Sequence, residues 1–123
     1  MIGIDRAVTV ISGATLSGLL LCSPAGAQTV TVEQFQHPKS EAEMNFNKTY
    51  LTGIKDGLMA FNMSQESKLF CIGGMPPELS FERASDILVR WARKRSGNSN
   101  GLPLGLAVLY SLKEAFPCQG NPR

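Results

Sequence analysis

The sequence has 123 residues, which is enough for one folded domain and too few for two of ordinary size. Apolar residues make up 43% of it, a proportion that is typical of a folded soluble protein and argues against a disordered chain. The net charge of +2 lacks the strong basic excess of most nucleic-acid-binding domains, so we expect no nucleic-acid partner.

Residues 1–27 are predicted to be a cleavable export signal. A short charged start precedes an apolar run of about 16 residues, and the small residues Ala25 and Ala27 follow as a cleavage site. The apolar run is shorter than the ~20 residues that span a bilayer, so we expect no stable membrane anchor. We therefore predict cleavage between Ala27 and Gln28, export to the periplasm, and one mature domain of residues 28–123.

The first predicted helix follows residues 28–38, whose pattern fits equally a short extended lead-in and a frayed terminus. Ser40 and Glu43 form a capping box, in which the serine oxygen can accept from the backbone N–H of the glutamate while the glutamate side chain reaches back. Helical spacing then marks a stripe that we expect to be buried: Tyr50, Leu51, Ile54, Leu58 and Phe61.

Two glycines, Gly53 and Gly57, lie one turn apart within this helix. Each costs about 1 kcal/mol of helix propensity relative to alanine, so some other interaction should compensate. The sequence leaves open whether they allow close approach of another helix or mark a kink. The prediction that can be tested directly is the close approach, with both glycines facing a neighbouring helix.

A connector, residues 64–78, is predicted next, because its paired glycines and paired prolines stop helices. Ser80 offers an N-cap for a second helix. The cations at the end of that helix suit the negative C-terminal end of the helix dipole. Its predicted buried stripe is Phe81, Ala84, Ile87, Leu88 and Trp91.

A polar segment, residues 96–101, is small and rich in turn-forming residues, which predicts a flexible exposed loop. Pro103 suits the first position of a third helix, and Pro117 should end it. The predicted buried stripe of this helix is Leu104, Ala107, Val108, Leu112 and Ala115.

Three cysteines are present, and we expect Cys22 to leave with the export signal. A lipoprotein site at Cys22 fits poorly, because Leu21 stands where a small residue is normal. Cys71 and Cys118 then remain, and a pair of cysteines in an exported protein predicts a disulfide. The expected fold is therefore all-α, a bundle of about three to five helices stapled by one disulfide.

Catalytic and cofactor motifs are not evident in the sequence. The lone histidine, His37, has no Cys or His at metal-ligand spacing, so we expect neither a metal nor a cofactor. We found no convincing nucleophile or phosphate-binding motif and predict that the protein is not an enzyme. The cations Arg93, Lys94 and Arg95 either complement the end of the second helix or form a docking patch for an acidic partner.

Three segments of the chain match short sequence motifs. Tyr50, Leu51, Gly53 and Gly57 match a Y-L-x-G-x-x-x-G element, Phe70-Cys71-Ile72 is similar to an F-C-I/V-P segment, and residues 112–118 are similar to a closing A-L-x-x-x-F/Y-P-C. In these motifs the chain resembles the Tai/Rap-type immunity proteins. The resemblance covers residues 47–118. The sequence departs from it where Gly73-Gly74-Met75 precede the proline and where Ser111 replaces alanine.

The resemblance implies an exported protein that binds and inhibits a peptidoglycan amidase effector of type VI secretion by blocking its cleft, and a possible homodimer. It implies no cofactor and no catalysis. The connector and the polar loop are the segments expected to enter the cleft. The candidate partner-binding residues are Gly73, Gly74, Arg93, Lys94, Arg95, Asn98 and Asn100.

Two other functions remain open at this point. Periplasmic acid-stress chaperones are also small, helical and exported with one disulfide, although the Y-L-x-G-x-x-x-G element argues against that class. A stand-alone envelope protein without a toxin partner is the second alternative.

Overall fold

The computed structural model describes residues 29–74 and 76–119. The predicted export signal and its cleavage site at Ala27 and Gln28 lie outside these residues. Within them the chain forms four helices and no strand, which confirms the predicted all-α class. The helices are α1 (Val32–Gln36), α2 (Glu41–Ser64), α3 (Phe81–Arg93) and α4 (Leu104–Ala115).

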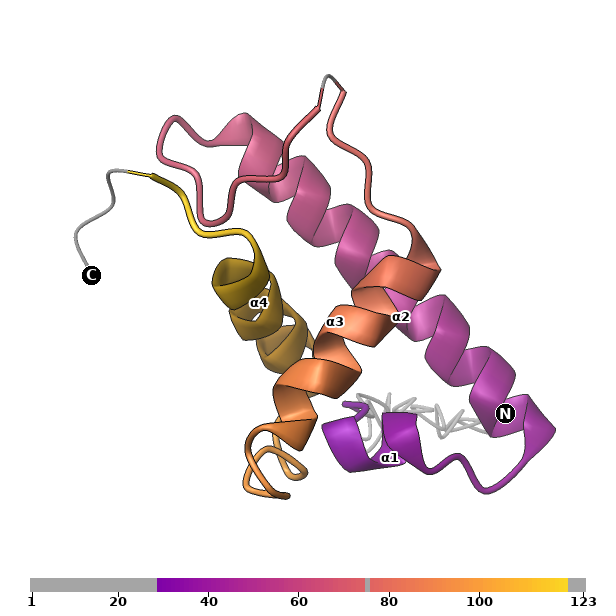
Figure 1. Ribbon diagram of the computed structural model, residues 1–123. Coiled ribbons are helices and arrows are strands. Elements are labelled where there is room, and N and C mark those ends of the chain that lie inside the picture. Colours follow the sequence, from indigo (N-terminus) through magenta and orange to yellow (C-terminus); the bar gives the residue numbers. More distant parts are fainter. Residues whose placement is uncertain (1–28, 75, 120–123) are drawn as a thin grey trace, which may run out of the picture.

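The long helix α2 runs diagonally across the molecule, and α3 and α4 pack against each other and against it (Figure 1). The short helix α1 lies across the base and contacts α2 and α4. A single core joins all four, built from the buried faces of α3 and α4 together with Leu51 of α2 and buried residues of α1 and the connecting segments, Val30, Val32, Phe70 and Leu79. No helix in the described ranges is long and apolar enough to cross a membrane.

The start of α2 confirms half of the predicted capping box. The hydroxyl of Ser40 accepts a hydrogen bond from the backbone N–H of Glu43 at 3.1 Å. The carboxylate of Glu43 accepts from the backbone N–H of Lys39 at 3.2 Å instead of from Ser40. Each of the two bonds satisfies a backbone N–H group near the start of α2, which favours a helix that begins after Ser40.

The predicted stripe of α2 is correct except at its last member. Leu51 is fully buried, and Tyr50, Ile54 and Leu58 are half-buried against the core. Phe61, by contrast, is 52% exposed. The core-facing position of that turn is taken by Asn62, and the preceding residue is rotated by about 100° around the helix axis.

The predicted close packing at Gly53 and Gly57 is wrong within this chain. Both glycines are exposed, and a Cβ atom added to either would meet nothing within 4 Å. The core-facing side of α2 contains Leu51, Ile54 and Leu58, whereas the two glycines lie on the outward side. Of the four residues in that motif, only Tyr50 and Leu51 pack against the core.

The other two predicted stripes are confirmed with one exception. In α3 and α4 all the predicted residues are buried or half-buried except Ala115, which lies in the last turn of α4 and is exposed. Ser80 caps α3 by accepting from the backbone N–H of Arg83 at 3.1 Å. Pro103 is the N-cap of α4 and not its first helical residue, a shift of one position.

The undecided segment before α2 forms α1. Thr31 and Gln34 make a full capping box, with the backbone N–H of Gln34 donating to the threonine hydroxyl at 3.2 Å and the backbone N–H of Thr31 donating to the glutamine side chain at 2.9 Å. Val30 and Val32 are buried in the core. This segment is therefore an integral part of the domain.

Candidate partner-binding site

The two segments expected to meet a partner lie at opposite ends of the molecule (Figure 1). We call residues 65–80 with 116–119 the connector end, and residues 94–103 with 30–36 the loop end. The loop end joins α3 to α4 and lies beside α1, whereas the connector end joins α2 to α3 and lies beside the end of α4. The two segments therefore present separate surfaces.

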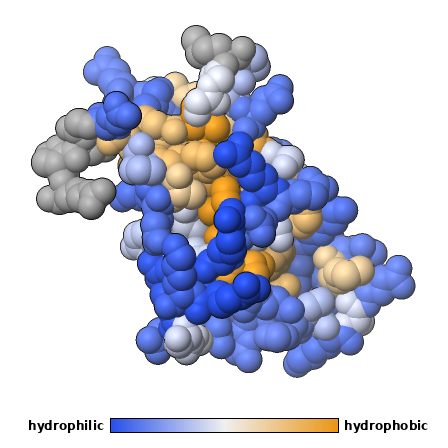
Figure 2. Space-filling view, viewed as in Figure 1, coloured by the Kyte–Doolittle hydropathy of each residue, from blue (hydrophilic) through white to orange (hydrophobic). Residues whose placement is uncertain are grey.

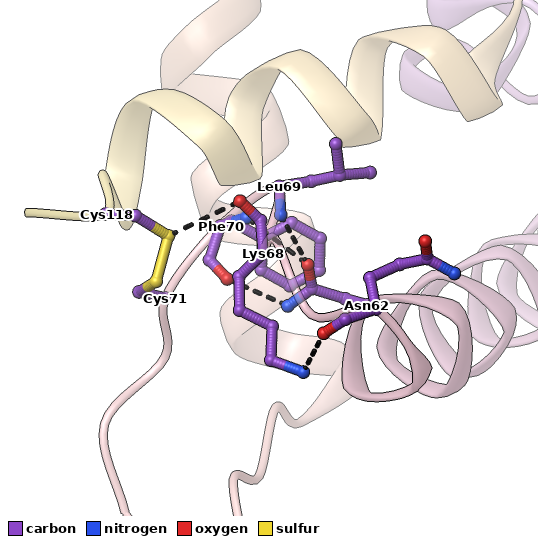
Figure 3. The surroundings of a disulfide bond; sticks show 7 residues. Asn62, Lys68, Leu69, Phe70, Cys71 and Cys118 are labelled. Carbon is purple, nitrogen blue, oxygen red and sulfur yellow. Dashed lines mark hydrogen bonds between the residues drawn. A yellow bond between two sulfur atoms is a disulfide. The ribbon is translucent and has the colours of Figure 1, made fainter. Parts of the chain in front are cut away.

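At the connector end the predicted disulfide between Cys71 and Cys118 is present, with a Cα–Cα distance of 5.0 Å. The backbone N–H of Cys71 also donates to the carbonyl of Phe116 at 2.8 Å. The bridge and this hydrogen bond together fasten the connector to the residues just after α4. The disulfide and its surroundings are shown in Figure 3.

Asn62 is the polar centre of the connector end. Its side chain donates to the carbonyl of Phe70 at 2.8 Å and accepts from the backbone N–H of Leu69 at 2.7 Å (Figure 3). Both partners belong to the connector, so one buried side chain replaces the backbone pairing that a helix would have supplied. Phe70 is consequently held in the core, where it is almost completely buried.

Beyond this anchored base the connector is exposed. Gly73 has nothing within 4 Å of its missing Cβ, and Gly74 has a φ of +101°, a conformation that glycine adopts without strain. A hollow of about 410 Å³ opens beside them, lined by Met59, Met63, Phe70, Ile72 and Pro77 among others. Figure 2 shows apolar surface gathered on this upper part of the molecule, while the lower part is mostly hydrophilic.

The loop end is more firmly packed than the sequence predicted. The backbone N–H groups of Val32 and Glu33 donate to the carbonyls of Leu102 and Asn100, both at 3.1 Å, and consecutive turns follow one another through the loop. Ser99 is only 1% exposed and Asn100 is half-buried. The expectation of a wholly exposed loop is therefore wrong, because the first turn of α1 covers one side of it.

The candidate residues of the loop end divide into two groups. Asn98 and Lys94, and Arg93 at the end of the preceding helix α3, are exposed, as expected of a docking surface. Arg95 instead lies over the Trp91 ring at 3.9 Å from the guanidinium carbon to the ring centroid and donates to the Trp91 carbonyl at 2.9 Å. Arg95 therefore completes the end of α3, which is the first of the two roles that the sequence suggested for these cations.

Glu114 on α4 links the cations to the bundle. Arg95 donates to its carboxylate at 3.0 Å and Lys94 at 3.4 Å. The hydrogen bond from Arg95 lowers the pKa of this carboxyl below its ordinary value, with Lys94 adding to the effect against an opposing contribution from burial. Three charges, two from the residues just after α3 and one from α4, thus form one surface network.

Two buried asparagines were not singled out from the sequence. Asn47 donates to the carbonyl of Gln34 at 2.9 Å and ties α1 to α2, and Asn62 holds the connector. Their spacing was a usable signal, because both fall on the helical repeat of Leu51, Ile54 and Leu58. A polar residue on an apolar stripe needs a hydrogen-bond partner, and both asparagines find one in a neighbouring segment.

Residues suited to metal binding are not gathered in residues 29–74 and 76–119, since no group of three or more His, Cys, Asp or Glu is placed to hold an ion there. His37 is exposed beside a shallow hollow near Arg93 and Asn100.

A sequence profile of the Rap1a immunity proteins matches residues 12–118. The chain belongs to this family. Rap1a proteins are immunity proteins of type VI secretion, a class that is generally not enzymatic and typically periplasmic, so membership assigns this chain to immunity against a type VI effector and implies a protein partner. No curated protein and no solved structure matches the chain.

The matched range includes all four helices and both disulfide cysteines, Cys71 and Cys118. It therefore covers the connector end and the loop end alike, so that the Rap1a assignment applies to the whole described domain except its last residue.

Proposed function

We propose that the protein binds a peptidoglycan amidase effector of type VI secretion and inhibits it by occluding its substrate cleft, as in the Tai/Rap type. The observation that carries the proposal is the Rap1a family match over residues 12–118, joined with the three segments of the Tai/Rap pattern. Occlusion needs a rigid shape and no chemistry, which suits a small disulfide-closed helical domain.

The connector is the segment that we propose to enter the cleft. Gly73 is exposed and unobstructed, while the disulfide and Asn62 hold the base of the connector. A protruding segment on a fixed base loses little conformational entropy on binding, which favours affinity. The loop end lies at the opposite end of the molecule, so its cations contact a different part of the effector.

Cleavage of the export signal is a further prediction of the proposed function. An amidase that acts on the cell wall meets its inhibitor in the periplasm, so the chain should be cleaved between Ala27 and Gln28. N-terminal sequencing of the protein from a periplasmic fraction should return Gln28 as the first residue. Retention of residues 1–20 would contradict this step.

We also propose that two copies pair through the outward face of α2. Phe46 and Phe61 on this helix are both more than half exposed, and Gly53 and Gly57 leave open space between them. Antiparallel pairing about a two-fold axis near Gly53 would bring Phe46 of each copy beside Phe61 of the other and would set the glycines of both copies at the centre, where the two helices can approach closely. The unexplained helix cost of two glycines in α2 is then compensated between chains.

The pairing is tested by the mass of the protein in solution. Light scattering should give the mass of a dimer for the wild type and of a monomer for Gly57→Leu, which fills the open space without meeting any atom of its own chain. Asn45→Leu, at an exposed position about 100° around the helix from Phe46, is the control and should leave the dimer intact. A monomeric wild type would contradict the pairing.

The inhibition is tested with the amidase effector encoded beside the gene and purified peptidoglycan. Rising concentrations of the wild type should abolish cleavage, and the inhibitor should be recovered unchanged. Gly73→Trp should weaken inhibition roughly ten-fold or more, because bulk in a buried contact is poorly tolerated. Arg93→Ser with Lys94→Ser should mainly slow association and reduce its dependence on salt.

Failure to inhibit would favour one of the other two functions. Suppression of client aggregation at acidic pH, without inhibition of the amidase, would favour an acid-stress chaperone. Neither activity, together with an unaffected Gly73→Trp variant, would leave an envelope protein of another role.

A further inference from the structure

A second hollow, of about 530 Å³, lies at the loop end and is not part of the connector surface. We call it the Trp91 hollow. It is lined by the end of α3, the loop and the outer side of α4, with Trp91, Arg95, Asn98, Ser99, Tyr110 and Lys113 among its residues.

Two polar atoms at this hollow have no hydrogen-bond partner, although neither is open to solvent. They are the indole Nε1 of Trp91 and the hydroxyl oxygen of Ser99. Trp91 is 6% exposed and Ser99 is 1% exposed. Buried polar groups without partners are unfavourable and rare, and the two described residues that carry them both line this hollow.

The chemistry of the lining indicates what is missing. An indole N–H can only donate, and a serine hydroxyl, an asparagine amide and a lysine ammonium can all donate as well. The one carboxylate of the lining, Glu114, already accepts from Arg95 and Lys94. The hollow therefore has donors to spare, and the group that would complement it is an acceptor.

The charge of the surroundings favours a negatively charged acceptor. Lys94, Arg95 and Lys113 contribute three positive charges at or beside the hollow, against the single negative charge of Glu114. A carboxylate can accept several hydrogen bonds at once and would also satisfy the positive potential.

The residue types are those that dominate the energetics of protein interfaces. Trp91 and Tyr110 have stacked rings with centroids 6.4 Å apart, and Tyr110 is 47% exposed, so an aromatic wall is available to an incoming side chain. Arg95 covers the Trp91 ring at the rim. Tryptophan, tyrosine and arginine are the residues enriched at interface hot spots.

We propose that the Trp91 hollow binds an acidic side chain, aspartate or glutamate, of the effector. This inference rests on the proposed function in requiring a protein effector, but it does not require that the connector enters the cleft. Entry of the carboxylate needs the side chains of Asn98 and Arg95 at the rim to move. Arg95 is held there by a hydrogen bond to the Trp91 carbonyl, by its position over the Trp91 ring and by an exposed ion pair with Glu114, and a second carboxylate can replace the ion pair.

The test uses the single tryptophan of the chain as a reporter. In ¹⁵N-labelled protein only Trp91 gives an indole N–H signal. Addition of the unlabelled amidase effector should shift this signal downfield and slow its exchange with water, because the indole acquires a charged acceptor.

Two variants separate binding from folding. Trp91→Phe keeps an aromatic ring and removes the indole N–H, and Ser99→Ala removes the hydroxyl. Each should weaken binding of the effector roughly ten- to hundred-fold, as expected for loss of a hydrogen bond to a charged group. Ser99→Ala should lower the thermal midpoint no more than the control Ser67→Ala, because it removes a buried polar atom that has no partner in the free protein. Trp91→Phe also removes core packing and should lower the midpoint, so its affinity is compared with that of the wild type at a temperature at which both proteins are fully folded. A purely structural role of both side chains would leave the affinity of the folded variants unchanged.

The remaining outcomes decide separately whether the Trp91 hollow binds a carboxylate and whether the amidase is the partner. If the effector binds while the indole signal stays unmoved and Trp91→Phe binds as the wild type, the hollow is filled by water and the inference is overturned. If the effector does not bind the wild type at all, the proposed amidase partner is wrong. Titration with N-acetyl-glutamate methylamide, against the neutral N-acetyl-glutamine methylamide, then decides the site alone: a shift with the acidic compound only supports it, and no shift overturns it.

Discussion

The two ends of the bundle are stabilised in contrasting ways. The loop end is held by backbone hydrogen bonds that run through its turns and across to the residues before α1. The connector end has few backbone bonds of its own, and is held by a disulfide and by the side chain of Asn62. The glycines and prolines that leave the connector exposed also deprive it of regular backbone pairing, so side-chain and covalent links replace that pairing.

This difference predicts how each end responds to mutation. The connector end should depend heavily on a few side chains, whereas the loop end should tolerate the loss of any one of them. The predictions below test that contrast, beginning with the largest expected effect.

Removal of the disulfide should have the largest effect on stability. Cys71→Ser with Cys118→Ser opens a loop of sequence separation 47 and should lower the free energy of unfolding by roughly 4 kcal/mol, because the unfolded chain gains entropy. Urea denaturation with and without reductant measures this. On reduction, the urea midpoint of the wild type should fall to that of the variant, while the midpoint of the variant should not change. An unchanged wild type under complete reduction would contradict the prediction.

Asn62→Ala should be the most damaging single substitution of a polar residue at the connector end. It leaves the backbone N–H of Leu69 and the carbonyl of Phe70 without partners and should cost about 2–4 kcal/mol of unfolding free energy. Asn45→Ala, on the exposed side of the same helix, is the control and should stay within about 0.5 kcal/mol of the wild type. Equal melts for both variants would show that the connector is held by the disulfide alone.

Asn47→Ala should cost less, about 1–2 kcal/mol, although Asn47 is as deeply buried as Asn62. It removes a single bond, to the carbonyl of Gln34, while the backbone bonds of the loop end keep α1 in place. Chemical denaturation of the two asparagine variants side by side measures the contrast directly. A larger loss at Asn47 than at Asn62 would reverse our comparison of the two ends.

Glu114→Gln should have the smallest effect, under about 1 kcal/mol, because its ion pairs are exposed. The pKa of Glu114 is lowered in the folded protein, so its ion pairs stabilise the fold above the ordinary carboxyl pKa. That contribution is lost as the pH falls through the folded value. The thermal midpoints of variant and wild type should therefore differ slightly at neutral pH and converge in acid or at high salt, and a constant difference would argue against the ion pairs.

Much of the fold follows from local sequence patterns. The starts of α2 and α3 were predicted from Ser40 and Ser80, and the stripes of α3 and α4 from helical spacing, because caps and amphipathic faces act over a few residues. The disulfide followed from the count of cysteines. The burial of Val30 and Val32 could not be predicted in the same way, since it depends on a loop about seventy residues further along the chain.

The candidate site was predicted less completely. The exposed positions Gly73, Gly74, Arg93 and Asn98 were predicted from composition, but Gly53 and Gly57 show the limit of a motif, since spacing alone does not tell which face of a helix meets a neighbour. The unpartnered polar atoms of Trp91 and Ser99 could not be predicted from the sequence, because the lack of a hydrogen-bond partner depends on how distant segments pack around each atom.

The first described residues also determine how the start of α4 is capped. No side chain caps α4, and its first backbone N–H, that of Leu104, donates to the carbonyl of Val30 at 2.8 Å. Val30, just before α1, thus does for α4 what a serine does for α2 and α3. Trimming of the chain past Val30 by an aminopeptidase would leave a helix far away in sequence without its cap, so the intactness of the amino terminus can be followed by the amide signal of Leu104.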